Sequence, residues 1–195
     1  MKKEDIITLP NPKLRQRSVK VSDIDANMRQ LADDMTSASL DWEDSRPHEI
    51  SAALAAVQLG SLYRAIVVRS NFDDKEDRDF TALINPEIIK YEGEEVEDYE
   101  GCLSVTKGIY GMVKRASKIR VRALDIDGNE IRFKADGFLA RVIQHEVDHL
   151  NGIVFVDRIR DNHEAFYHLE ENGELASIDF NENIKNNREL WDDLK

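Results

Sequence analysis

The feature that most constrains this chain is a His-Glu-x-x-His motif at residues 145–149. Side chains four residues apart on an α-helix lie on the same face, about one turn above each other. His145 and His149 can therefore point both imidazoles at a single metal ion. Glu146 follows the first histidine, where its carboxylate can reach a water on the metal without itself binding the metal. The motif predicts a helix that carries two metal ligands and a base.

The residues around the motif indicate that this helix is buried. Apolar side chains recur at helical spacing before and within it, at Leu139, Val142, Ile143, Val147 and Leu150. Asp136 is a candidate N-cap and Gly152 a candidate C-terminal stop. Histidines carried into an apolar interior need polar partners, and a metal ion provides one. These flanks favour metal binding over a chance motif with both histidines in water.

The composition is that of a soluble globular protein. Its 195 residues are enough for one domain, and its formal charge of −12 disfavours binding to nucleic acid or to an anionic membrane. No apolar run is long enough for a transmembrane helix, and the N-terminal stretch lacks the apolar region of a signal peptide. The single cysteine, Cys102, excludes an intrachain disulfide. We therefore expect a cytoplasmic protein with a free thiol.

Short apolar segments outside the motif predict an α+β fold. Ser22 is expected to open an amphipathic helix that ends before a polar loop at 38–49. Strands are predicted at 65–68, 81–89, 118–124, 131–133 and 153–156, with Asp127-Gly128 as a hairpin turn and Asn85-Pro86 as an interruption. The run of small residues at 50–60 is interpreted as a short buried helix or strand. We expect antiparallel strands packed around a central metal-binding helix, with the first helix outside.

Two histidines need at least one further protein ligand to make a catalytic metal site. A metzincin protease would continue the motif to a third histidine, but Phe155 stands at that position. A gluzincin protease would use a downstream glutamate, and Glu164, Glu170 and Glu171 are available in an acidic stretch. The remaining candidate is Cys102 in a tight Glu-Gly-Cys-Leu-Ser turn, although a free cysteine is more often a small buried apolar residue. The residues by themselves leave these alternatives open.

Three segments resemble the signature motifs of the peptide deformylase family. Residues 100–104, Glu-Gly-Cys-Leu-Ser, and residues 144–150, Gln-His-Glu-Val-Asp-His-Leu, are closely similar to two of them. Residues 51–58, Ser-Ala-Ala-Leu-Ala-Ala-Val-Gln, look like the third, Gly-x-Gly-Leu-Ala-Ala-x-Gln. Segments 84–86 and 135–140 resemble further parts of the family in the same order. The resemblance covers roughly residues 5–160.

The resemblance implies a metal-dependent hydrolase acting on a linear amide. Such an enzyme removes the N-formyl group from the N-terminal methionine of nascent polypeptides and releases formate. It implies one divalent ion, held by Cys102, His145 and His149. The ion would be Fe²⁺ in the cell, with Zn²⁺, Ni²⁺ or Co²⁺ as alternatives in purified protein. Glu146 would act as the base, while the Gln58 amide and the backbone N–H of Leu103 would donate to the charge that develops on the formyl oxygen.

The resemblance also assigns residues around the reacting groups. Candidates for orienting the ligands are Glu100, Arg115 and Asp148. Candidates for contact with the substrate are Ser51, Ala53, Gly101, Tyr110 and Arg141. Ser51 and Ala53 replace both glycines of the first motif, and Tyr110 replaces an arginine that many members carry. Glycine permits close approach of another backbone, so we expect these replacements to crowd the strand that pairs with the substrate.

We therefore expect a deformylase-like catalytic domain at 1–160 and an acidic, helical C-terminal extension at 161–195. The extension carries ten acidic and three basic side chains, so it lacks the basic helix with which some relatives are thought to dock on the ribosome. The expected partners are N-formyl-methionyl peptides, with at most transient ribosome proximity and no direct binding of nucleic acid or membrane. The alternatives are a deformylase-like protein that binds metal or peptide with low turnover, and a gluzincin-type protease.

Overall fold

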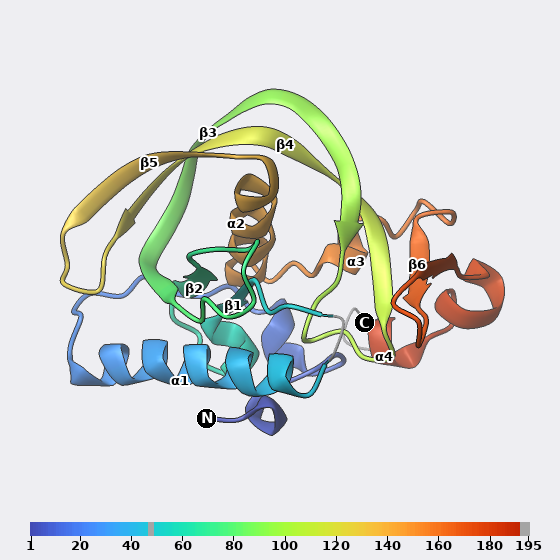
Figure 1. The fold of residues 1–195 in the computed structure, drawn as a ribbon, viewed down its shortest axis with the longest axis horizontal. Coiled ribbons are helices and arrows are strands. Elements are labelled where there is room, and N and C mark those ends of the chain that lie inside the picture. Colours follow the sequence, from blue (N-terminus) through green and yellow to red (C-terminus); the bar gives the residue numbers. More distant parts are fainter. Residues whose placement is uncertain (47–48, 192–195) are drawn as a thin grey trace.

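The computed structural model describes residues 1–46 and 49–191. Its α-helices are α1 (Ala26–Asp44), α2 (Gly137–Leu150), α3 (Phe155–Arg158) and α4 (Arg188–Trp191). Its strands are β1 (Ala53–Ala55), β2 (Ala65–Arg69), β3 (Phe80–Glu100), β4 (Ile109–Leu124), β5 (Glu130–Asp136), β6 (Phe166–Leu169) and β7 (Leu175–Ser177). Figure 1 shows α2 beneath the arch of β3 and β4, with α1 running across the other side of the sheet. This arrangement confirms the α+β class and the central helix predicted from the sequence.

The strands form a single antiparallel sheet. Its order is β1-β2-β3-β4-β6-β7, and β5 pairs with β4 alongside this path. The long strand β3 continues through Asn85-Pro86, which the sequence marks as an interruption, because a register shift between Ile84 and Glu87 absorbs the dipeptide. Asn85 has a positive φ of 52° at this irregularity. β1 lies at the end of the strand order, so one of its edges is left open toward other parts of the chain.

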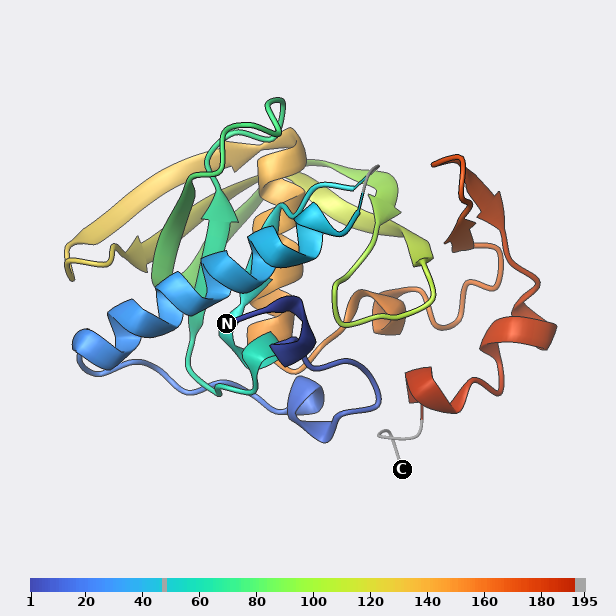
Figure 2. The same cartoon turned by 60° about the horizontal axis from the view of Figure 1, so that its bottom comes forward.

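Alternating side chains of the sheet build a separate core on each of its faces. One face of the sheet carries Ala53 and Ala55 together with buried residues of β2 and β4, and this face packs against α2. Leu54 and Ala56 point the other way and pack with α1 through Met28 and Met35. The period of two along a strand accounts for this division. Because α2 is covered on its sheet side and at its end, the residues of its second half are all buried. Figure 2 shows α1 crossing in front of the sheet and α2.

The first helix and the last predicted strand differ from the structure. The first helix starts at Ala26 rather than at Ser22, because the Asp25 side chain caps it by accepting the N–H of Met28 at 2.9 Å. It also runs on to Asp44, through residues assigned to a loop, because Glu43 and its neighbours on the inner face are buried. Residues 153–156 do not form a last strand: helix α3 begins at Phe155, whose ring packs in the core beneath β4.

The sequence predicts a helical extension at 161–195, but most of its described part is not helical. Phe166–Leu169 forms β6, which pairs with Ile109–Gly111 of β4, and a turn leads into β7. Phe166 at the start of β6 is buried, whereas His168 on the same face is exposed, so the cover over this strand decreases along its length. A short π-helix at Phe180–Ile184 and helix α4 follow, and residues 192–195 lie outside the described part. Phe166, Ile184 and Leu190 join a core with Leu14 and Val113, so this segment packs on the body.

Within residues 1–46 and 49–191, no helix is both long enough and apolar enough to span a bilayer.

Candidate metal centre

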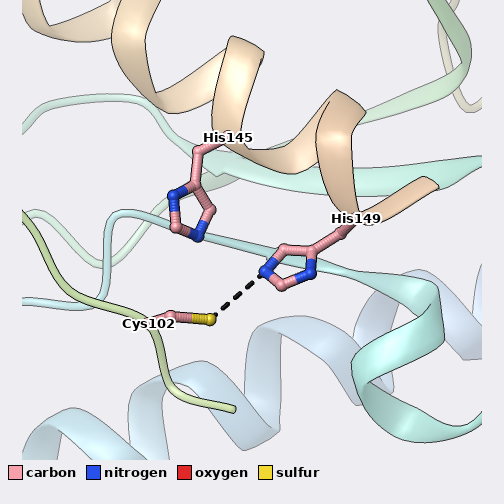
Figure 3. Close-up of side chains that lie close together, drawn as sticks. All are labelled: Cys102, His145 and His149. Carbon is pink, nitrogen blue, oxygen red and sulfur yellow. Dashed lines mark hydrogen bonds between the residues drawn. The ribbon is translucent and has the colours of Figure 1, made fainter. Parts of the chain in front are cut away.

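Three possible metal ligands meet between α2 and the turn that follows β3 (Figure 3). The ligand atoms of Cys102, His145 and His149 all lie within 4.8 Å of one another. The Cys102 sulfur is 3.2 Å from Nε2 of His149, and both imidazoles are buried. The two histidines lie on the same face of α2, as their four-residue spacing predicts.

The turn that carries Cys102 is shaped by close packing and by its own hydrogen bonds. The backbone N–H of Ser104 points to the Cys102 sulfur at 3.4 Å, and the N–H of Val105 donates to the carbonyl of Cys102. Gly101 is required because a Cβ there would lie 2.7 Å from the ring of Tyr110. The chain therefore turns closely against β4, which presents the sulfur to α2.

A buried carboxylate fixes the orientation of the first histidine. Nδ1 of His145 lies 2.9 Å from Oε2 of Glu100, which leaves Nε2 facing the other ligands. Burial opposes ionisation of Glu100, but hydrogen bonds from Arg115 and His145 outweigh it and hold the pKa of that carboxyl well below its usual range. Arg115 binds both oxygens of Glu100, at 2.8 and 2.9 Å. Glu100 is thus held as an anion beside the ligands.

The same arginine continues the network to α2. Nη1 of Arg115 contacts Oδ2 of Asp148 at 2.5 Å, and Arg158 of α3 makes ion pairs with the same carboxylate. The three residues that sequence analysis proposed to orient the ligands, Glu100, Arg115 and Asp148, are therefore brought together in one buried network. Arg158 was missed, because nothing in the motif marks a residue ten positions after Asp148.

Glu146 follows the ligand His145 on α2, and its carboxylate is buried. Its Oε2 has no hydrogen-bond partner among the described residues. Burial raises the pKa of Glu146 to about 7. A buried carboxylate oxygen without a partner is costly unless water or a ligand contacts it. This arrangement suits a group that exchanges protons with a molecule bound next to the three ligands.

The donor set fits a divalent transition-metal ion. One sulfur and two imidazole nitrogens are soft and intermediate donors of the kind that such ions prefer, and three protein ligands leave a further position open. Burial lowers the pKa of His145, but hydrogen bonds with Cys102 and Glu100 outweigh it and raise that pKa, whereas burial lowers the pKa of His149. The glutamates of the gluzincin alternative, Glu164, Glu170 and Glu171, are exposed and outside this cluster.

Gln58 also lies beside the sulfur of Cys102. Its Nε2 is 3.7 Å from Cys102 Sγ and donates to the hydroxyl of Ser104 at 3.1 Å, while its Oε1 accepts the N–H of Ala55 at 2.8 Å. The amide is therefore oriented with its donor end toward the ligands. Ser104, which sequence analysis did not single out, supplies part of this orientation. Leu103 follows Cys102 in the turn and lines the same cleft.

A cleft of about 850 Å³ leads to the ligands. Its walls include four of the five residues predicted to contact substrate: Ala53, Gly101, Tyr110 and Arg141. Ser51 is not among the lining residues: it is fully buried, so the expectation that it crowds the substrate is wrong at this position. Its backbone N–H donates to the side chain of Glu43.

Arg141 and Tyr110 line the cleft but are already engaged. The guanidinium of Arg141 donates to Glu100 at 2.8 Å and to the carbonyls of Val113 and Val96. The Tyr110 hydroxyl donates to Oε2 of Glu49 at 2.6 Å. Glu49 is a cleft residue that sequence analysis missed, since it lies in a stretch that reads as an ordinary polar loop.

The fold and this site define a metal-dependent hydrolase: three ligands beside a buried carboxylate, at the inner end of a peptide-sized cleft. The polypeptide deformylase family model matches residues 3–165 of the chain. A peptide deformylase of Thermomicrobium roseum is 45% identical over 174 residues, which is 88% of this chain and 94% of that protein.

Solved structures agree with the sequence comparisons. The peptide deformylase of Synechococcus elongatus, crystallised with actinonin, has a TM-score of 0.70 and 37% identity over 78% of each chain. The Met-Ala-Ser-bound class I type b enzyme of Acinetobacter baumannii has a TM-score of 0.68 and 33% identity, over 78% of this chain and 97% of that one. The chain belongs to the polypeptide deformylase family. Its activity is the metal-dependent removal of the N-formyl group from formyl-methionyl peptides.

Proposed function

We propose that Cys102, His145 and His149 together hold one divalent ion, Fe²⁺ in the cell, and that Zn²⁺, Ni²⁺ or Co²⁺ can replace it in purified protein. The convergence of their ligand atoms beside Glu146, whose Oε2 has no partner within residues 1–46 and 49–191, carries this proposal. A bound ion would supply Lewis acidity, which lowers the pKa of water and polarises a carbonyl. The thiol donor also makes the site sensitive to oxidation.

Glu146 is proposed as the general base and then the general acid. Its free Oε2 is placed to take a proton from the attacking water and to return that proton to the departing amine nitrogen. The formyl carbon gains the oxygen of that water, the C–N bond breaks, and formate and a free methionine N-terminus remain. The peptide Met-Ala-Ser, bound in the Acinetobacter baumannii relative, has the form of such a product.

The Gln58 amide and the N–H of Leu103 are proposed to stabilise the charge on the formyl oxygen. The orientation of Gln58 by Ala55 and Ser104 supports this role. Donors that are fixed in advance lose little free energy in reorganising when the charge develops. Glu100, Arg115 and Asp148 are proposed to keep His145 and the C-terminal half of α2 in place, since Glu100 bonds to His145 and Arg115 joins Glu100 to Asp148.

Replacement of Gln58 by alanine should lower kcat/KM for formate release by about 10- to 100-fold, the worth of one hydrogen bond to a developing charge. The bound metal should remain, because Gln58 is not a ligand. Gln58→Glu separates the two ends of the side chain: it keeps an acceptor for the N–H of Ala55 but loses the donor. Both variants are compared by formate release and metal analysis. Parental kcat/KM in Gln58→Glu would contradict the donor role.

The proposed substrates are peptides that begin with N-formylmethionine and extend along the open edge of β1. The cleft has room for several residues, and Ala53 lines it where many members have glycine. The decisive test is metal content together with formate release from formyl-Met-Ala-Ser, in protein purified without oxygen. Stoichiometric metal with peptide binding and no formate would favour the alternative, a deformylase-like binding protein.

We further propose that the chain acts in the cytoplasm, with residues 1–160 as the catalytic domain and 161–195 as an acidic extension. The extension has ten acidic and three basic side chains, so ribosomal RNA should repel it. We also propose that it binds neither nucleic acid nor membrane directly.

The full chain should show no salt-sensitive binding to ribosomes through this extension. Co-sedimentation at about 50 and 200 mM salt measures this, because contacts with phosphates weaken steeply over that range. The charge reversals Lys185→Glu and Arg188→Glu serve as the comparison. Binding that falls with salt and disappears in these variants would contradict the proposal.

A further inference from the structure

A fully buried ion pair lies behind one wall of the cleft and has no part in the mechanism above. Glu43, near the end of α1, and Arg69, at the end of β2, have side chains with no exposed surface. Nη1 of Arg69 donates to Oε2 of Glu43 at 2.8 Å. Arg69 also donates to the carbonyls of Asn71 and Lys75, so its charge is well solvated by the protein. Removing an ion pair from water costs free energy, so we ask what this pair does at its position beside the cleft.

The same oxygen of Glu43 holds the start of the cleft strand. Oε2 accepts the backbone N–H of Ser51 at 2.8 Å, and the hydroxyl of Ser51 has no partner among the described residues. Ser51 is thus held through its main chain. The second oxygen of Glu43 likewise has no partner among those residues, so Oε2 makes both bonds.

The direction of the backbone along β1 shows what this bond does. The N–H of Arg69 donates to the carbonyl of Ala52, so the backbone carbonyl of Ala52 points to β2. Successive residues of a strand alternate, and positions 51, 53 and 55 therefore turn their N–H and C=O groups to the open edge. On that edge the N–H of Ser51 is held by Glu43 and the N–H of Ala55 by Gln58. Ala53 lies between these two bonds and lines the cleft.

We propose that Glu43 is a positioning residue for the substrate, with Arg69 as its charge partner. Glu43 fixes one end of the open edge of β1, and Gln58 fixes the other. The backbone N–H and C=O of Ala53, between them, are therefore held in a fixed position for hydrogen bonds to a peptide. This inference rests on the proposed function, in which the substrate backbone extends along β1. Glu43 does not touch the reacting atoms, so its loss should weaken peptide binding more than it slows the chemical step.

Two double variants separate the hydrogen bond from the charge. Glu43→Gln with Arg69→Gln removes both charges but keeps an amide oxygen for the N–H of Ser51. Glu43→Leu with Arg69→Leu removes the charges and that acceptor. Both variants lose the arginine bonds to Asn71 and Lys75, so these losses cancel in the comparison. Neither variant leaves a single charge buried without its partner, which is the strongly destabilising case.

With formyl-Met-Ala-Ser as substrate, KM should be about 3- to 10-fold higher in the leucine double variant than in the glutamine one, the worth of one hydrogen bond. The kcat values should agree within about twofold, and the metal content should be equal. A purely structural role would lower kcat and metal content together. Equal KM values in the two variants, or a difference confined to kcat, would overturn the proposal.

If the leucine double variant does not fold, a second pair of variants tests the same proposal. Ser51→Pro removes the N–H itself, and Ser51→Ala keeps it. The proposal expects KM to rise more in the proline variant, and equal KM values would refute it. If the parent chain releases no formate, the proposed function fails by itself. Hydrogen exchange at residues 50–55 then decides the positioning role: exchange should be faster in the leucine than in the glutamine double variant, and equal rates overturn it.

Discussion

Glu146→Gln should bind metal as the parent does and should release formate about 10² to 10⁴ times more slowly, the usual contribution of a positioned general base. The amide has the same shape, so the packing of α2 against the sheet is preserved. It cannot accept a proton from water, and it cannot pass one to the leaving amine. Single-turnover formate release and metal analysis on the same preparation measure the two properties separately.

The control for this prediction is Glu164→Gln, which makes the same chemical change at an exposed position. It should leave both metal content and rate unchanged. If Glu146→Gln turned over near the parental rate, another group would have to be the base. The nearest other carboxylates, Glu100 and Asp148, are engaged by arginines, which leaves little room for such a substitute.

The site could be predicted from the sequence to the extent that it is local. Residues 145–149 lie on one helix, and the spacing of the two histidines determines their common face. The position of Cys102 could not be derived in the same way. It depends on β3 and β4 arching over α2, an arrangement that no local pattern encodes, and it was reached through the resemblance to a family.

Two of the errors, one in the fold and one in the site, share a physical cause. The short apolar stretch Phe166–Leu169 has no clear period and is predicted as helix, but it forms a strand because it pairs with β4 and β7. Ser51 was placed in the cleft because the motif alone does not show which way the side chain points. In both cases a tertiary contact decided the outcome: the edge of β4 in the first and the carboxylate of Glu43 in the second.

Cys102→Ala should weaken metal binding by more than about 100-fold, since even the outer partners of metal ligands are worth 10- to 100-fold. The two histidines would remain on α2, but two imidazoles alone do not complete a tetrahedral site. Formate release should fall with metal occupancy, which distinguishes this variant from Glu146→Gln, where the rate falls and the metal stays. Metal content after dialysis and kcat/KM under exclusion of oxygen are the measurements.

The same experiment decides between the cysteine and the downstream glutamates as third ligand. Glu164→Ala and Glu170→Ala should keep metal and activity, because both side chains are exposed and lie away from the ligand cluster. Full metal content in Cys102→Ala, with loss in either glutamate variant, would instead support the gluzincin set. The geometry argues for the cysteine: its sulfur lies 3.2 Å from Nε2 of His149, in a turn whose backbone is closed by Gly101 packing on Tyr110. One sulfur and two imidazole nitrogens that converge this closely in a buried site form a ligand set suited to a shared cation.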